Sequence, residues 1–137
     1  MEFISSDTNI WIDFATINHL ELPFLLEYQY LMNNDAIEDE LLQPKDLKNN
    51  LIKLGLKSTE LTMEEFLLAE KYGLEYKKLS IYDRIALAIA KNRKIKLLTG
   101  DLHLRKAAKQ EMVQCIGTLG ILDRLLAYER ISERECQ

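Results

Sequence analysis

Short apolar runs that alternate with helical stretches are the feature of this sequence that most constrains its fold. Four runs have the composition of buried strands and end near turn-forming residues; they are Glu2–Ser6, Leu25–Met32, Lys94–Leu98 and Val113–Ile116. Strands separated by helices predict a mainly parallel sheet with helices on both faces, a three-layer α/β/α sandwich. At 137 residues and 47% hydrophobic content, the chain is expected to form a single domain over residues 1–137.

Two of the expected helices begin with a recognisable start signal. Thr62 and Glu65 have the spacing of a capping box, and the helix that they open is expected to end at Gly73. Ser80 and Asp83 repeat this spacing before a run of almost entirely apolar residues, which predicts a buried helix. Further helices are expected at Ala36–Leu42, Pro44–Gly55, Leu102–Glu111 and Thr118–Tyr128.

Four acidic residues stand where a parallel sheet could gather them. Asp7 and Asp101 directly follow predicted strands. Asp83 lies on the first turn of the buried helix, and Glu40 lies in the helix after the second strand. Each has an ordinary explanation, as a helix N-cap, a capping-box member or part of a solvated acidic face. Together they predict one site, because ligands of such sheets bind beyond the carboxyl ends of the strands.

Carboxylates gathered at one edge would repel one another, and some would have to take up protons unless a cation neutralised them. Ligand sets made only of oxygen suit Mg²⁺ or Mn²⁺, and Mg²⁺ often takes additional oxygens from a phosphate substrate. A bound ion can turn water into a nucleophile, and a second ion can stabilise the leaving oxygen. The four acids therefore indicate metal-assisted hydrolysis of a phosphodiester.

Four segments, in this order and spacing, resemble the PIN domain: residues 6–9 (Ser-Asp-Thr-Asn), 39–42 (Asp-Glu-Leu-Leu), 80–83 (Ser-Ile-Tyr-Asp) and 97–101 (Leu-Leu-Thr-Gly-Asp). Residues 117–122 resemble the closing block of a bacterial and archaeal PIN subgroup, so the resemblance covers nearly the whole chain. It implies an α/β/α sandwich that cleaves single-stranded RNA with Mg²⁺ or Mn²⁺, often as the homodimeric toxin of a toxin and antitoxin pair. The implied catalytic and metal-binding residues are Asp7, Glu40, Asp83 and Asp101.

Four further residues are expected to support this site. The same match implies that Asn9 and Thr99 orient a carboxylate or a metal-bound water, although both are also ordinary turn residues. Arg84 and Arg105 each lie within one helical turn of a candidate acid, so both are expected to contact substrate phosphates.

Three points stay open at this stage. Glu38 and Asp39 compete with Glu40 for the second acid, and Glu40 is preferred because two leucines follow it as in the family pattern. After Asp101, many relatives place another acidic or amide residue where this chain has Leu-His-Leu-Arg, which leaves the number of metal ions open. Trp11 fits the core as well as it fits a platform for stacking bases.

Charge is distributed unevenly along the chain, whose net charge is −4. Residues 1–70 carry 14 acidic and 4 basic side chains, residues 71–109 carry 3 and 11, and residues 110–137 carry 5 and 3, giving balances of −10, +8 and −2. A basic block within an acidic protein is typical of a face that binds a polyanion. A solvated lysine-rich surface explains the same block.

Other functions and the cellular location can also be weighed from the sequence. A PIN-like scaffold that binds RNA or protein without cutting is the main alternative. A phosphatase with a phosphoaspartate intermediate would require an acid at Asn9, and a receiver domain would require acids in place of Ser5 and Ser6. No signal peptide or membrane span is visible, so a soluble, cytoplasmic protein is expected.

Overall fold

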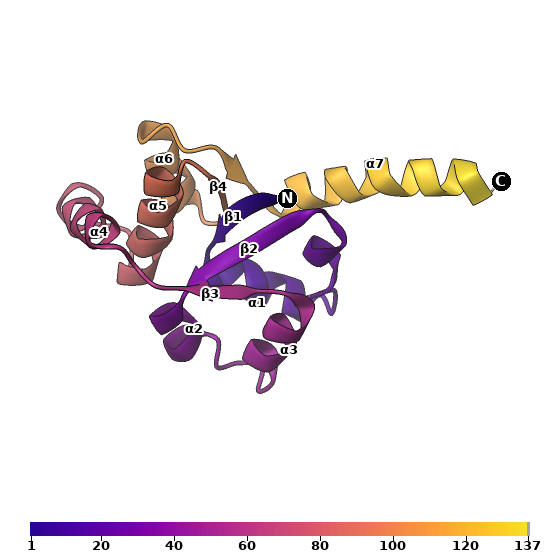
Figure 1. The fold of residues 1–137 in the computed structure, drawn as a ribbon, viewed down its shortest axis with the longest axis horizontal. Coiled ribbons are helices and arrows are strands. Elements are labelled where there is room, and N and C mark those ends of the chain that lie inside the picture. The colour runs from indigo at the N-terminus through magenta and orange to yellow at the C-terminus, as the bar shows by residue number, and fades with distance from the viewer. Residues whose placement is uncertain (137) are drawn as a thin grey trace.

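The fold is built on a sheet of five parallel strands (Figure 1). The computed structural model describes the backbone of residues 1–136 and the side chains of residues 1–127. The strands lie in the order β3-β2-β1-β4-β5 and are β1 (Glu2–Ser6), β2 (Tyr28–Asn33), β3 (Lys57–Thr59), β4 (Lys96–Leu98) and β5 (Cys115–Ile116). This sheet confirms the predicted α/β class.

Helices cover both faces of the sheet, as the three-layer prediction requires. One core packs one face against α1 (Thr8–Thr16), α2 (Asn34–Glu40), α3 (Leu47–Leu54) and the short 3₁₀ helix η1 (Leu22–Leu25). A second core packs the other face against α4 (Met63–Glu75), α5 (Ile81–Arg93) and α6 (Leu102–Gln110). Leu97 and Leu98 show the division, because these neighbours in β4 point to opposite faces and belong to different cores.

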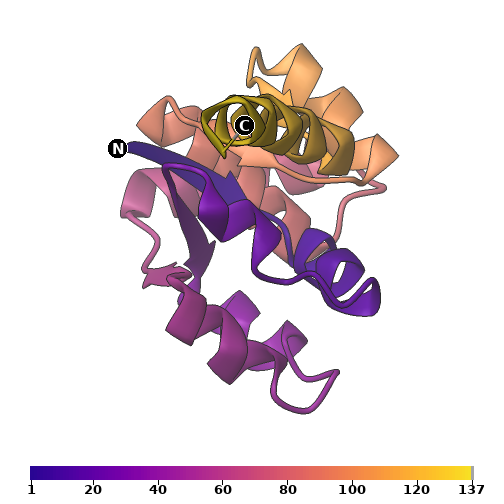
Figure 2. The same ribbon diagram turned by 90° about the vertical axis from the view of Figure 1, so that its right-hand side faces the viewer.

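Helix α7 (Thr118–Cys136) leaves the body of the protein after β5. Its first turns pack near η1, where Ile121 joins the first core. Figure 1 shows the rest of α7 extending away from the sheet, and Figure 2 looks along it from its C-terminal end. None of the helices described is both long and apolar enough to cross a membrane.

Both predicted capping boxes form, but one helix end was predicted wrongly. Thr62 accepts the N–H of Glu65 at the start of α4, and Ser80 accepts the N–H of Asp83 at the start of α5. Helix α4 does not end at Gly73 but continues to residue 75. A Cβ at this glycine would lie 2.3 Å from Nη1 of an arginine in α5, so the glycine permits close helix packing rather than ending the helix.

The four predicted strands form, but a fifth was missed and several strand bounds differ. Strand β3 was missed because its three residues are polar or charged and mostly exposed at the sheet edge. The second strand begins at Tyr28 rather than Leu25, since the preceding residues form η1, whose second residue is Pro23. Helix α3 begins at Leu47, three residues after Pro44, and β4 and β5 each begin two residues later than predicted.

Candidate active site

The candidate site lies where the strand order reverses. From β1 the chain passes through α1 to β2 on one side, whereas β4 pairs with β1 on the other side. Asp7 follows β1 directly, and its N–H donates to the Leu98 carbonyl at 3.0 Å. Thr99 and Asp101 follow the end of β4. Such a switch point opens a crevice at the carboxyl ends of the strands, which is where open α/β sheets bind ligands.

Thr99 joins the two strand-end acids. Its side chain is fully buried, and its Oγ1 donates a hydrogen bond to Oδ2 of Asp7 at 2.9 Å. The same oxygen accepts the N–H of Asp101 at 3.1 Å. One hydroxyl therefore fixes the carboxylate after β1 and the main chain after β4, which is the supporting position expected for Thr99.

Asp7 is an unusual buried acid because the groups around it do not neutralise its charge. Only 4% of the residue is exposed. Burial raises the pKa of Asp7 most, and the charges of Asp83 and Asp101 also raise it, whereas hydrogen bonds from Thr99 and from the Asn9 main chain lower it; the net pKa is about 7. Asp83 and Asp101 are therefore near enough to Asp7 to act on its charge.

Asp83 and Asp101 also perform the structural roles that were their alternative explanation. Asp83 accepts the N–H of Ser80 at 3.0 Å and completes the capping box of α5. Asp101 accepts the N–H of His103 at 3.2 Å and caps α6. Both carboxylates also raise the pKa of Asp7, so capping and an influence on Asp7 are compatible here.

The three consecutive acids at the end of α2 have different partners. Glu38 pairs with Lys48 at 2.9 Å, and Asp39 accepts a hydrogen bond from the Tyr82 hydroxyl. Glu40 instead accepts the Thr8 hydroxyl at 2.5 Å. Thr8 is buried and directly follows Asp7 in the sequence, so Glu40 contacts the neighbour of Asp7, whereas Asp39 contacts the neighbour of Asp83.

Asn9 and Trp11, the two other candidates in α1, have different surroundings. Asn9 has an exposed side chain, and its contribution to Asp7 comes from the main-chain N–H. Trp11 is fully buried, stacks on Phe24 with ring centroids 5.2 Å apart and donates to the Ser6 hydroxyl at 3.0 Å. Trp11 is therefore a core residue and not a platform for stacking bases.

The two predicted arginines differ in their surroundings. Arg84 is half-buried, its Nε lies 3.3 Å from the carbonyls of Leu79 and Ser80, and its guanidinium packs over Gly73. Arg105 is exposed on α6, near Gly117 at the end of β5. Only Arg105 presents its charge to solvent.

Two residues near the site were missed by sequence reasoning. Thr8 lies in the segment 6–9 but was given no role, and its contact with Glu40 joins residues 32 positions apart. Asp13 lies two turns along α1, and its Oδ2 would be 3.7 Å from a Cβ at Gly100. Its i, i+4 spacing from Asn9 places both on one face of α1, which is the sequence signal that could have found it.

The donor chemistry of the site suits a hard divalent cation, since all the candidate ligands are oxygen atoms of carboxylates or hydroxyls. Such a cation would stabilise the charged form of Asp7, a buried carboxylate whose pKa is raised by burial and by two other acids. As the side chains stand, no three His, Cys, Asp or Glu residues within the described part of the chain lie close enough together to hold a metal ion.

The chain belongs to the PIN-domain family, because the family model described as DUF3368, a PIN domain, matches residues 3–136. PIN domains are generally nucleases and typically use a divalent metal ion. No curated protein matches the sequence.

Two solved structures have a similar fold. One is a PilT N-terminus domain protein, SSO1118, from the hyperthermophilic archaeon Sulfolobus solfataricus P2, with a TM-score of 0.66 and 14% identity, covering 89% of this chain and 92% of that chain. The other is VapBC2 from Rickettsia felis bound to a DNA fragment from its promoter, with a TM-score of 0.55 and 11% identity, covering 85% of this chain and 98% of that chain. Sequence identities this low carry the fold alone.

Proposed function

We propose that residues 1–137 form one PIN domain that acts as a Mg²⁺- or Mn²⁺-dependent endoribonuclease on single-stranded RNA. The observation that carries this proposal is the buried carboxylate of Asp7, whose pKa is raised to about 7 by burial, Asp83 and Asp101 at the switch point of the sheet. Keeping an acid in such surroundings costs folding free energy, and a bound cation would offset that cost.

We assign the metal-binding and catalytic roles to Asp7, Glu40, Asp83 and Asp101. Bound there, the cation would supply a water of lowered pKa and charge stabilisation for the phosphodiester. Thr99 orients the Asp7 carboxylate, and Thr8 orients that of Glu40. The main-chain N–H of Asn9 assists Asp7. Among the side chains of residues 1–127, no basic group pairs with Asp7, so it is the residue on which the site most depends.

Only one of the two arginines keeps its proposed contact with the substrate. We keep Arg105 as a phosphate contact, because it is exposed on the helix that Asp101 caps. Arg84 is assigned to holding the start of α5, since its guanidinium is occupied by the carbonyls of Leu79 and Ser80. Its influence on the site would then pass through the position of Asp83.

We also propose that the protein is a homodimeric cytoplasmic toxin neutralised by an antitoxin, as the PIN family and the likeness to a VapBC structure suggest. Self-association is supported by the outer face of α4, where Met63, Phe66, Leu67 and Leu74 are 50–77% exposed at helical spacing. An apolar stripe of this kind is usually covered by another protein surface, here a second copy. Sedimentation at tens of micromolar should show a species twice the mass of the 16.0 kDa chain.

The experiment that tests the nuclease is cleavage of a single-stranded RNA by purified protein with Mn²⁺, with Mg²⁺ and with EDTA. Cleavage with either ion and its loss in EDTA is the expected result. Cleavage that persists in EDTA would contradict the metal mechanism. Absence of cleavage under all conditions would favour the binding scaffold, with which the lack of a ready-made metal-binding cluster among the described residues is consistent.

A further inference from the structure

The basic residues of segment 71–109 divide into two groups by what they contact. Five of the eleven are engaged within the protein, by a carboxylate or by main-chain carbonyls; they are Lys71, Arg84, Lys91, Arg93 and Lys96. The other six form no ion pair with any side chain in residues 1–127; they are Lys77, Lys78, Lys94, Arg105, Lys106 and Lys109. The positive charge of this block therefore resides mainly in the second group.

Five of these six residues line two hollows that share helix α6. The smaller hollow, of about 280 Å³, lies between α6 and the segment that precedes α5. It is lined by Lys77, Lys78, Lys106 and His103. Arg105, Lys106 and Lys109 line a second hollow, of about 500 Å³, between α6 and β5. Lys106 borders both. Residues 77–78 and 105–109 lie far apart in the sequence, so the fold gathers these charges.

Both hollows extend to the first turn of α6, the helix that Asp101 caps. His103 lines the smaller hollow, and its N–H donates to the Asp101 carboxylate at 3.2 Å. Leu102, the residue directly after Asp101, lines the larger one. A chain lying along either hollow would therefore pass close to Asp101.

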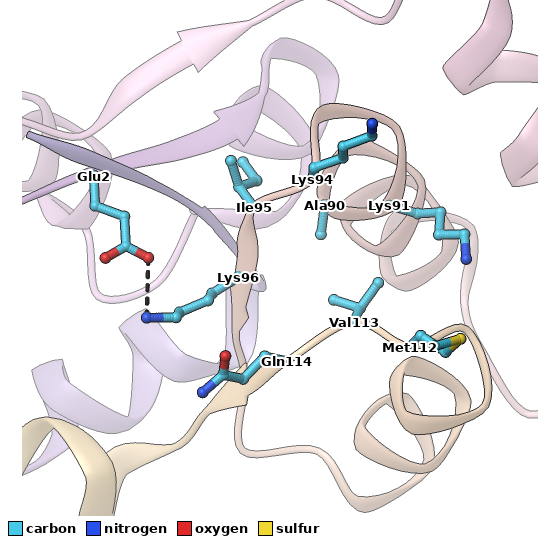
Figure 3. A pocket seen from close by; sticks show the side chains of 9 residues that line it. All are labelled: Glu2, Ala90, Lys91, Lys94, Ile95, Lys96, Met112, Val113 and Gln114. Carbon is cyan, nitrogen blue, oxygen red and sulfur yellow. Dashed lines mark ion pairs between the residues drawn. The ribbon is translucent and has the colours of Figure 1, made fainter.

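A third hollow, of about 450 Å³, provides a contrast within the same protein (Figure 3). It lies at the amino ends of the strands, away from the acids, since Glu2 and Lys96 begin β1 and β4. Two of its three lysines are already occupied: Lys96 pairs with Glu2 at 3.1 Å, and Lys91 donates to the Glu111 carbonyl at 2.6 Å. Only Lys94 is left without a contact, so this hollow offers one such lysine where the α6 hollows offer five basic side chains.

We infer that the two α6 hollows, with Lys77, Lys78, Arg105, Lys106 and Lys109, form the track that binds the phosphate backbone of single-stranded RNA and leads it to the acids. The inference rests on the proposed function, which it extends by naming the surface that holds the substrate. Lysines without protein partners bind phosphates as point charges, and such contacts position a nucleic acid without reading its sequence. The track therefore predicts binding that depends strongly on salt and weakly on sequence.

The experiment measures binding of a fluorescein-labelled, 20-nucleotide single-stranded RNA by anisotropy, in EDTA and from 50 to 300 mM KCl. Each phosphate contact on a single strand contributes about 0.7 to the slope of log affinity against log salt. Lys106→Gln should reduce the slope by about 0.7 and weaken binding about fivefold at 100 mM. Lys77→Gln combined with Lys78→Gln should reduce the slope by about twice as much. The matched control is Lys94→Gln, which removes an exposed and unpaired lysine at the opposite edge and should leave both quantities unchanged.

The inference is overturned if the α6 variants bind like the wild type, or if Lys94→Gln weakens binding as much as Lys106→Gln. It is also overturned if the wild type shows no salt-dependent RNA binding, which would leave an acidic protein as the occupant of this surface. Because binding is measured in EDTA, it is separate from cleavage. If the protein binds RNA along α6 but never cuts it, the track is supported and the nuclease is not. If the protein cuts RNA and its α6 variants bind and cut normally, the nuclease is supported and the track is not.

Discussion

Asp7 and Glu65 are both buried carboxylates, but their pKa values are shifted in opposite directions. Burial alone would raise the pKa of Glu65, but hydrogen bonds from Arg93, the Thr62 N–H and Asn92 outweigh it and hold the pKa at about 2. Asp7 is also buried, yet Asp83 and Asp101 add to the effect of burial and its pKa rises to about 7. Arg93 balances the charge of Glu65, whereas the charge of Asp7 would be balanced by a bound cation.

This difference separates structural from functional burial of charge. Glu65 is fully buried between α4 and α5, where Arg93 donates to it through Nε at 2.8 Å and through Nη2 at 3.0 Å. A buried carboxylate with a bidentate arginine serves packing, because its charge is already balanced. A buried carboxylate that faces other acids has no such use, and perturbed acids of this kind gather at functional sites.

The largest effect should come from removing the unbalanced charge. Asp7→Asn is expected to lower the rate of RNA cleavage with Mn²⁺ by about a thousandfold or more, because several kcal/mol of charge stabilisation depend on this ligand. The fold should survive, since Asn is close to Asp in shape and is about as good an N-cap. Cleavage is measured together with urea unfolding. A variant that still cuts at the wild-type rate would remove Asp7 from the site.

Removing the charge of Glu65 should lower stability and leave activity unchanged. Glu65→Gln is expected to lower the free energy of unfolding by about 4 kcal/mol, because the partly buried Arg93 would lose the fully buried anion that it pairs with. The rate of cleavage by the folded fraction should stay unchanged. Glu64→Gln is the matched control, since Glu64 is the exposed neighbour in the same helical turn and should change neither quantity. A loss of activity without a loss of stability in Glu65→Gln would contradict the comparison.

The pH dependence of stability should show how Glu65 is balanced. Its pKa is about 2 in the folded protein and 4.5 ordinarily, so the folded state favours the charged form. The stabilisation is fully present above pH 4.5 and is lost as the pH falls towards 2, by about 3 kcal/mol in total. Urea unfolding of wild type and Glu65→Gln between pH 6 and pH 2 should therefore show a difference that shrinks with acid. A constant difference would mean that Glu65 does not titrate in this range.

The sequence indicated the elements of the site better than it indicated their contacts. The strand-end positions of Asp7 and Asp101 and the capping box at Asp83 are local patterns, so they could be predicted. The choice of Glu40 over Asp39 depends on a hydroxyl 32 residues away, which no local pattern encodes.

The same limit applies to the rest of the molecule. Gly73 signals a helix end in sequence, yet the packing of an arginine from α5 explains its place in α4. Strand β3 is a polar edge strand whose pairing with β2, rather than its composition, makes it a strand. Charge blocks could be counted from the sequence, but only the fold shows which lysines already have partners.

The smallest expected effect concerns Thr99, the one hydroxyl that supports Asp7. Thr99→Val keeps the shape but removes both the donor to Asp7 and the acceptor for the Asp101 N–H, so cleavage should fall about tenfold, the equivalent of about 1.4 kcal/mol. Thr99→Ser keeps the hydroxyl and removes one buried methyl, so it should cost about 1 kcal/mol of unfolding free energy while cleavage stays within about twofold. The pair separates positioning from packing, because the first variant should lose activity and the second stability. If valine retains full cleavage and serine does not, the methyl group rather than the hydroxyl supports the site, and Asp7 is then held by packing alone.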